Sequence, residues 1–168
     1  MSMKYVVGIA LVLIVIVGLL LTIPSLSRVT LSATVETSKP IDQAFAYMAD
    51  FTTTTEWDPA TVVTEKISGD GRLGTRYRNT TEFNGTQTQV EYVVTDFQEN
   101  DRVELRGENK TLFAVDTMTF RRTATGTSVT YTAEFTFKGI YRLASPFLRG
   151  AFSKLEAGAL QGLQQHLR

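Results

Sequence analysis

Two acidic side chains stand where folding could bury them, and a buried carboxylate can act as a general base. Asp116 shares one face of a strand-like stretch with Met118 and Phe120, and Glu156 borders the apolar stripe of a C-terminal helical pattern. Burial disfavours the charged form and raises a carboxyl pKa, which suits proton transfer near neutral pH. In the alternative reading, Asp116 lies on an outward face or in a β-bulge and has no such role.

Other catalytic and metal-binding chemistries lack the residues that they need. The chain has one histidine, His166, and no cysteine, so neither a Ser-His-Asp nor a Cys-His arrangement can be assembled with identifiable partners. A zinc site of histidine and cysteine ligands is also excluded, and the remaining carboxylates are scattered over turns. We therefore predict no catalytic constellation, no metal site and no cofactor, and we favour a protein that is not an enzyme.

Composition indicates one globular domain with an added segment. The 168 residues carry 17 basic and 17 acidic side chains, so the formal net charge is zero. No basic run is present, and we predict no nucleic-acid partner.

The added segment is an N-terminal apolar run. Tyr5 to Ile23 holds nineteen residues without a charge, roughly the length that crosses the hydrocarbon core of a bilayer. The run exceeds a signal-peptide core and ends without an A-x-A cleavage site, which disfavours a cleaved leader. We expect a membrane anchor over residues 1–24, a linker over 25–28 and a domain over 29–168. Lys4 precedes the run, so the domain is predicted to be extracytoplasmic, against the lipid bilayer.

Alternating and turn-forming residues predict about six or seven antiparallel strands. Val29 to Glu36 alternates apolar and polar side chains, as does Thr127 to Phe137, which is typical of half-buried strands. Asn84-Gly85 predicts a two-residue hairpin. That register places Arg78 opposite Glu91 and Tyr77 opposite Tyr92.

A long amphipathic helix is predicted at the C-terminus, from Ser145 to Leu167. Ser145 can cap it, and Pro146 suits its first turn. Gly158 and Gly162 lie together on one flank, although glycine in a helix costs about 1 kcal/mol against alanine. Either a sheet packs very closely on these glycines, or the helix borders a hollow there. The apolar stripe consists of Leu148, Phe152, Leu155, Ala159, Leu163 and Leu167.

Successive strands followed by one long helix imply an α+β domain with the helix against one sheet face. At several points the sequence also resembles the START-like (SRPBCC) superfamily, in its polyketide cyclase/dehydrase and lipid-transport branch. The resemblance rests on Pro40 to Asp50, Trp57-x-Pro59, Gly74 to Tyr77 and Gly126 to Tyr131. It implies a helix-grip fold, in which a seven-stranded sheet curls around the C-terminal helix.

The resemblance also implies a ligand cavity between the sheet and the C-terminal helix, with Trp57 either near its entrance or in the core. Inward-facing aromatic and polar residues and the flank of the helix are the candidate lining. The predicted ligand-binding residues are Trp57, Tyr77, Asn79, Tyr92, Phe120, Tyr131, Phe135, Phe152, Leu155, Gly158, Ala159 and Gly162.

Three functions remain open from the sequence. The first is a membrane-anchored binding or transfer module for a lipid, an isoprenoid quinone or another apolar small molecule. The second is an enzyme of cyclase or dehydratase type that uses a buried carboxylate on an apolar substrate. The third is a structural partner in a membrane complex. We favour the binding module because no catalytic constellation is present.

Overall fold

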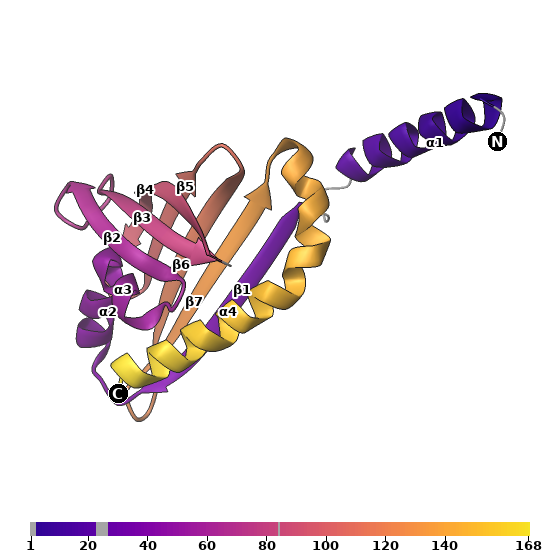
Figure 1. Ribbon diagram of the computed structural model, residues 1–168. Coiled ribbons are helices and arrows are strands. Elements are labelled where there is room, and N and C mark those ends of the chain that lie inside the picture. The colour runs from indigo at the N-terminus through magenta and orange to yellow at the C-terminus, as the bar shows by residue number, and fades with distance from the viewer. Residues whose placement is uncertain (1–2, 23–26, 84) are drawn as a thin grey trace.

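Seven strands form one sheet in the computed structural model, which describes residues 3–22, 27–83 and 85–168. Helices precede the sheet, interrupt its first connection and follow its last strand (Figure 1). In chain order the structure comprises α1 (Met3–Thr22), β1 (Arg28–Thr37), α2 (Ile41–Ala49), the 3-10 helix η2 (Phe51–Thr53), α3 (Thr54–Trp57), β2 (Thr61–Ser68), β3 (Arg76–Phe83), β4 (Thr86–Gln98), β5 (Arg102–Glu108), β6 (Leu112–Arg122), β7 (Thr127–Phe137), the 3-10 helix η3 (Gly139–Ala144) and α4 (Ser145–His166).

The sheet is antiparallel throughout, with the strand order β1-β7-β6-β5-β4-β3-β2. Strands β2 to β7 therefore follow one another as a meander, and β1 joins at the far edge beside β7. Helix α4 packs on β1 and on α3, and Figure 1 shows it running along β1, while α2 and α3 lie on the side of β2 and β3. The predicted α+β class and the sheet with a C-terminal helix are confirmed.

Both the strand alternation and the hairpin register follow the sequence pattern. In β1, Val29, Leu31, Ala33 and Val35 are buried while the residues between them are exposed. Tyr77 pairs with Tyr92 across the β3–β4 hairpin. Arg78 likewise pairs with Glu91, and its guanidinium donates to the carboxylate at 2.9 Å.

The prediction of a membrane anchor is wrong. Among the described residues, no helix combines the length and the apolarity that crossing a bilayer requires. The predicted single-pass localisation, with the domain outside the cytoplasm, is corrected by the same finding. The linker prediction over 25–28 falls partly outside the described residues, and β1 begins at Arg28.

A turn of the chain, rather than the sheet or a hollow, accounts for the two glycines of α4. A Cβ atom at Gly162 would lie 1.9 Å from the carbonyl oxygen of Trp57, and one at Gly158 would lie 2.7 Å from Cγ of Pro59. Both distances are shorter than any van der Waals contact between such atoms. The glycines therefore let α4 approach the end of α3, which justifies their cost in helix propensity.

The two halves of α4 have different roles. In the C-terminal half Leu163 is fully buried, and so is Leu167, directly after the end of the helix. The Leu167 carbonyl also accepts a hydrogen bond from Thr37 Oγ1, at the end of β1. In the first half, Phe152 and Leu155 are only partly buried. The C-terminal end of α4 is thus packed into the core, whereas the side chains of its first half are only partly covered.

We expect Gly162→Ala to destabilise the fold by about 1–3 kcal/mol, the usual cost of forcing extra atoms into a packed contact. Gly150→Ala is the matched control, because a Cβ at Gly150 in the same helix meets no atom within 4 Å. The control should be neutral or stabilising by up to about 1 kcal/mol. Urea unfolding measures both, and equal effects of the two changes would contradict the close contact.

Candidate functional site

A cavity of about 230 Å³ lies between the inner face of the sheet, the turn after α3 and the first half of α4. Six of the seven strands, all except β5, contribute residues to it, and so do α3 and α4. Its walls are Leu31, Phe51, Thr54, Asp58, Ala60, Thr61, Asn79, Thr81, Glu82, Phe83, Thr88, Val90, Tyr92, Thr111, Leu112, Asp116, Tyr131, Phe135, Phe137, Leu148, Phe152, Leu155 and Ala159.

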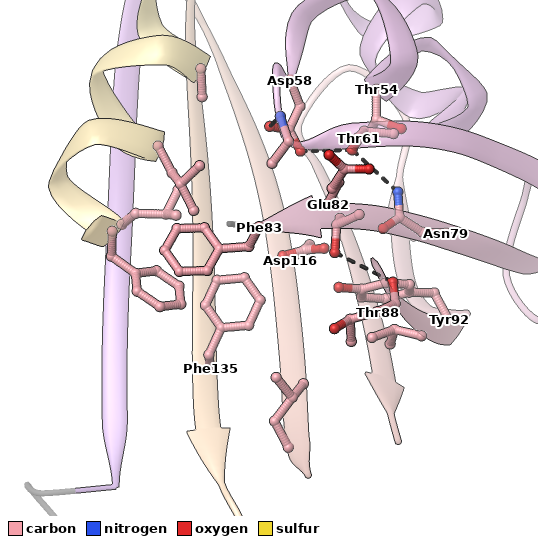
Figure 2. Close-up of a pocket in the computed structure, with 18 of the residues that line it drawn as sticks. Thr54, Asp58, Thr61, Asn79, Glu82, Phe83, Thr88, Tyr92, Asp116 and Phe135 are labelled. Atoms are coloured by element: carbon pink, nitrogen blue, oxygen red, sulfur yellow. Dashed lines mark hydrogen bonds between the residues drawn. The ribbon is translucent and has the colours of Figure 1, made fainter. Parts of the chain in front are cut away.

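The cavity has an apolar side and a polar side. Figure 2 shows Phe83 and Phe135 next to α4, whereas Thr61, Asn79, Thr88 and Tyr92 lie on the other side, with Asp116 between the two groups. On the apolar side, the rings of Phe135 and Phe152 pack 5.3 Å apart. A ligand there would meet aromatic and aliphatic carbon at one end and oxygen and nitrogen at the other.

Asp116 is the most buried charged side chain of the cavity, with 2% of its surface exposed. It lies in the middle of β6, opposite Leu105 of β5 and Ala133 of β7, on the same buried face as Met118 and Phe120. The strand alternation therefore carries a carboxyl group into the core. The alternative in which Asp116 faces outward is excluded.

Two tyrosine hydroxyl groups approach this carboxyl group. Tyr131 Oη donates to Asp116 Oδ1 at 3.4 Å, and the Tyr92 hydroxyl interacts with the same carboxyl. Gly107 of β5 lies opposite Tyr92 and makes room for its ring, since a Cβ there would lie 2.9 Å from Tyr92 Cδ1. The small residue in the neighbouring strand thus permits Tyr92 to lie over the sheet.

Burial, together with a smaller contribution from the nearby Asp58 charge, raises the pKa of Asp116 to about 7, although the hydrogen bonds from Tyr92 and Tyr131 oppose the shift. The pKa values of both tyrosines lie well above their ordinary value, chiefly because they are buried and also because Asp116 is near. Near neutral pH, Asp116 can therefore take up or release a proton while both tyrosines keep theirs.

Asp58 supplies a second carboxyl group from the end of α3. Its Oδ1 accepts the Ala60 backbone N–H at 3.0 Å, and its Oδ2 accepts the Thr61 hydroxyl at 2.7 Å. These hydrogen bonds stabilise the turn that leads from α3 into β2. Burial raises the pKa of Asp58, although both hydrogen bonds act in the opposite direction.

A short hydrogen-bonded chain forms the rest of the polar side. Asn79 Nδ2 donates to Thr64 Oγ1 at 2.7 Å and more weakly to Thr61 Oγ1 at 3.3 Å. Thr64 and Thr54 share a further bond of 2.7 Å between their hydroxyl groups. The threonines of α3 and β2 thus fix the Asn79 amide at the cavity wall.

The structure brings seven of the predicted ligand-binding residues to the cavity. They come from β3, β4, β7 and α4, which shows that the inward faces of these elements were correctly assigned. These residues are Asn79, Tyr92, Tyr131, Phe135, Phe152, Leu155 and Ala159.

The other five predicted residues do not line the cavity. Trp57 is 1% exposed and packs edge-to-face on Tyr131, so it belongs to the core. Tyr77 packs on Phe51, and Phe120 packs on Phe45 in the same way. Gly158 and Gly162 contact the turn after α3 instead.

Sequence reasoning missed other residues of the cavity wall. Asp58 and Glu82 are the charged ones. Asp58 directly follows the Trp57 of the family motif, which was a usable signal. Glu82 stands at the end of β3, where alternation predicts an outward side chain, and no sequence pattern marks it.

The second carboxylate candidate, Glu156, has a different role. Its Oε1 accepts the backbone N–H of Ser32 at 3.0 Å, and Ser32 lies in the edge strand β1. An unpaired edge N–H would otherwise invite pairing with another chain. Within the described part of the chain, no cluster of three or more His, Cys, Asp or Glu residues is placed to hold a metal ion.

An antiparallel sheet that holds a half-polar cavity against a C-terminal helix defines a helix-grip type of α+β domain. The chain belongs to the family described as polyketide cyclase/dehydrase and lipid transport, whose model matches residues 28–168. The resemblance to the START-like superfamily is confirmed.

Solved structures share this fold at low sequence identity. The Zhui aromatase/cyclase from Streptomyces sp. R1128 superposes with a TM-score of 0.69 at 13% identity, covering 83% of this chain and 93% of that chain. The major latex-like protein 151 from Panax ginseng gives a TM-score of 0.64 at 10% identity, covering 84% and 99%.

The di-domain aromatase/cyclase StfQ of the steffimycin biosynthetic pathway gives a TM-score of 0.65 at 15% identity over 86% of this chain. This chain spans about half of that protein, 52%. No curated protein sequence matches the chain.

Asp116→Asn should change how stability depends on pH. Unfolded aspartate ionises near pH 4, whereas the folded protein holds its Asp116 proton up to about pH 7. Between these values the folded state binds more protons, so wild-type stability falls as pH rises, by up to about 1.4 kcal/mol per unit. The variant lacks this contribution. Urea unfolding at pH values across that window should show that the free energy of unfolding of the variant rises relative to that of the wild type as pH increases. If the two free energies depend on pH in the same way, the raised pKa of Asp116 is contradicted.

Proposed function

We propose that this domain binds an apolar small molecule that carries a polar group at one end. The observation that supports it is the cavity of about 230 Å³ between the sheet and α4, apolar on one side and polar on the other. Binding pockets for small molecules are mostly apolar, with a few placed polar groups that orient the ligand. This cavity has that composition.

The size of the cavity favours an occupant larger than water. An apolar cavity of about 150 Å³ is already large enough to bind benzene, and this one is larger. Its aromatic side offers Phe83, Phe135, Phe137 and Phe152, which suits a ring system or a short acyl chain. Removing such surface from water is favourable by about 25 cal/mol per Å².

Leu155→Trp tests the location of binding. Leu155 lines the cavity from α4, so the larger ring should fill the space and weaken binding of the neutral fluorescent probe N-phenyl-1-naphthylamine roughly tenfold or more. Lys154→Trp is the matched control, since Lys154 is exposed on the same helix. The control should bind as the wild type does. Equal binding by both variants would place the probe elsewhere, and absence of wild-type binding would contradict the proposal.

A second function, general-base catalysis of cyclase or dehydratase type, is favoured by one observation. Asp116 lines the cavity and is buried, and its pKa of about 7 lies near the operating pH where a general base is most effective. In this function the Asp116 carboxylate removes a proton from an apolar carbonyl substrate. The name of the family, polyketide cyclase/dehydrase, suggests a polyketide as that substrate.

The base can be assayed with a model substrate, 5-nitrobenzisoxazole, even though the natural substrate is not identified. A general base opens the ring of this compound by elimination. A carboxylate removes the ring C–H proton while the N–O bond breaks, and the phenolate product is coloured. We expect a protein-dependent rate that rises with pH through about 7 and falls at least roughly a hundredfold in Asp116→Asn. A rate that persists in the variant would exclude Asp116 as the base, and it would leave the binding proposal standing.

A further inference from the structure

The charged residues of the cavity wall are all acidic. Asp58, Glu82 and Asp116 line it, and among its described residues there is no lysine, arginine or histidine. The chain as a whole has equal numbers of basic and acidic side chains. The chain has no net charge, but the charged residues of its cavity wall are all acidic.

Many of the basic side chains are instead paired with carboxylates outside the cavity. Arg76 and Arg78 both contact Glu91, at 3.1 Å and 2.9 Å. Arg106 contacts Glu104 at 2.7 Å, and Lys138 contacts Glu108 at 2.8 Å. None of these pairs lines the cavity, so none of them neutralises the acidic wall.

Asp116 has too few hydrogen-bond donors for a buried carboxylate. A carboxylate has about four acceptor positions, and hydroxyl donors normally approach to about 2.5–3.0 Å. The hydroxyl of Tyr131 stays at 3.4 Å, and the Tyr92 hydroxyl is the second donor. About two of the four acceptor positions therefore remain unfilled on a side chain that is 2% exposed. An unfilled buried acceptor of this kind costs about 1–3 kcal/mol or more, which a ligand that donates hydrogen bonds would recover.

The aromatic wall complements the acidic one. Tyr92, Tyr131 and Phe135 share the cavity with Asp116, and aromatic ring faces attract cations by about 0.5–2 kcal/mol, more strongly when water is excluded. A carboxylate that shares its cavity with several aromatic rings is a suitable environment for an ammonium group.

We propose that the cavity selects a ligand whose polar end is a protonated amine, held by Asp116 with Asp58 nearby, and whose apolar body lies against the phenylalanines and α4. This inference rests on the proposed binding function and names its ligand class. The amine would donate to the unfilled oxygens of Asp116, and its charge would offset those of the acidic wall.

The pH dependence distinguishes an amine from a neutral ligand. The titratable groups that interact with Asp116 are Asp58 from the turn after α3, Tyr92 from β4 and Tyr131 from β7. Glu82, from the end of β3, also lines the cavity. The residues of α4 that line the cavity (Leu148, Phe152, Leu155 and Ala159) carry no charge. An amine needs the ionised carboxylate, so its affinity should rise as pH increases through about 7. A carbonyl ligand would need the protonated acid, and its affinity should fall over the same range.

Three ligands of matched shape test the proposal: 2-(1-naphthyl)ethylamine, 2-(1-naphthyl)ethanol and 1-naphthylacetic acid. Titration calorimetry of the full chain at about pH 8 should show the amine binding roughly tenfold or more tightly than the alcohol, and the acid binding most weakly. At about pH 6 the advantage of the amine should shrink several-fold. In Asp116→Asn the amine should lose its advantage while the alcohol keeps its affinity.

The outcomes separate this proposal from the one on which it rests. Equal affinity for amine and alcohol, with both weakened by Leu155→Trp, would overturn the amine class and leave the cavity as a binding site. Tighter binding of the acid would also overturn it. If neither the three ligands nor the fluorescent probe binds, the proposed binding function is wrong.

Discussion

The close contact between α4 and the turn after α3 is the constraint on which the cavity depends. Because Gly162 has no side chain, the backbone of α4 can lie against the Trp57 carbonyl, and Gly158 meets Pro59 in the same way. That contact fixes the C-terminal half of α4, where Leu163 and Leu167 are buried. The first half of the helix then covers a space that the sheet does not fill. The same turn carries Asp58, so one packing contact positions both the helix that covers the cavity and one of its carboxyl groups.

A second constraint is electrostatic. β6 carries Asp116 into the centre of the sheet's buried face, where no basic residue among the described residues of the cavity wall compensates its charge. Burying an uncompensated carboxylate costs several kcal/mol and is partly relieved by taking up a proton, which explains its raised pKa. Proteins commonly keep such costly groups where ligands or substrates use them. The general-base alternative and the amine class both derive from this one side chain, and they differ in what neutralises it, whereas the binding proposal rests on the cavity itself.

Local patterns in the sequence predicted the framework well, because they depend on neighbouring residues alone. The alternation of Val29 to Val35 and the Asn84-Gly85 signal fixed strand faces and one register, which the structure confirms. Asp116 was recognised as a candidate, but alternation does not determine which face of a strand is covered. The role of Gly162 depends on a contact with a residue about a hundred positions away, which no local pattern reveals. Asp58 had a local signal, its position directly after Trp57 of the family motif, but only the approach of α4 makes its turn part of the cavity wall.

The most direct test of this account is the ionisation of Asp116 itself, followed by the carbon-13 shift of its carboxyl group with and without 2-(1-naphthyl)ethylamine. In the free protein the group should titrate near pH 7. With the amine bound, its pKa should fall by two or more units, roughly, because a buried opposite charge favours the ionised form. An Asp116 that titrates near pH 4 in the free protein, or that does not respond to the amine, would contradict the account.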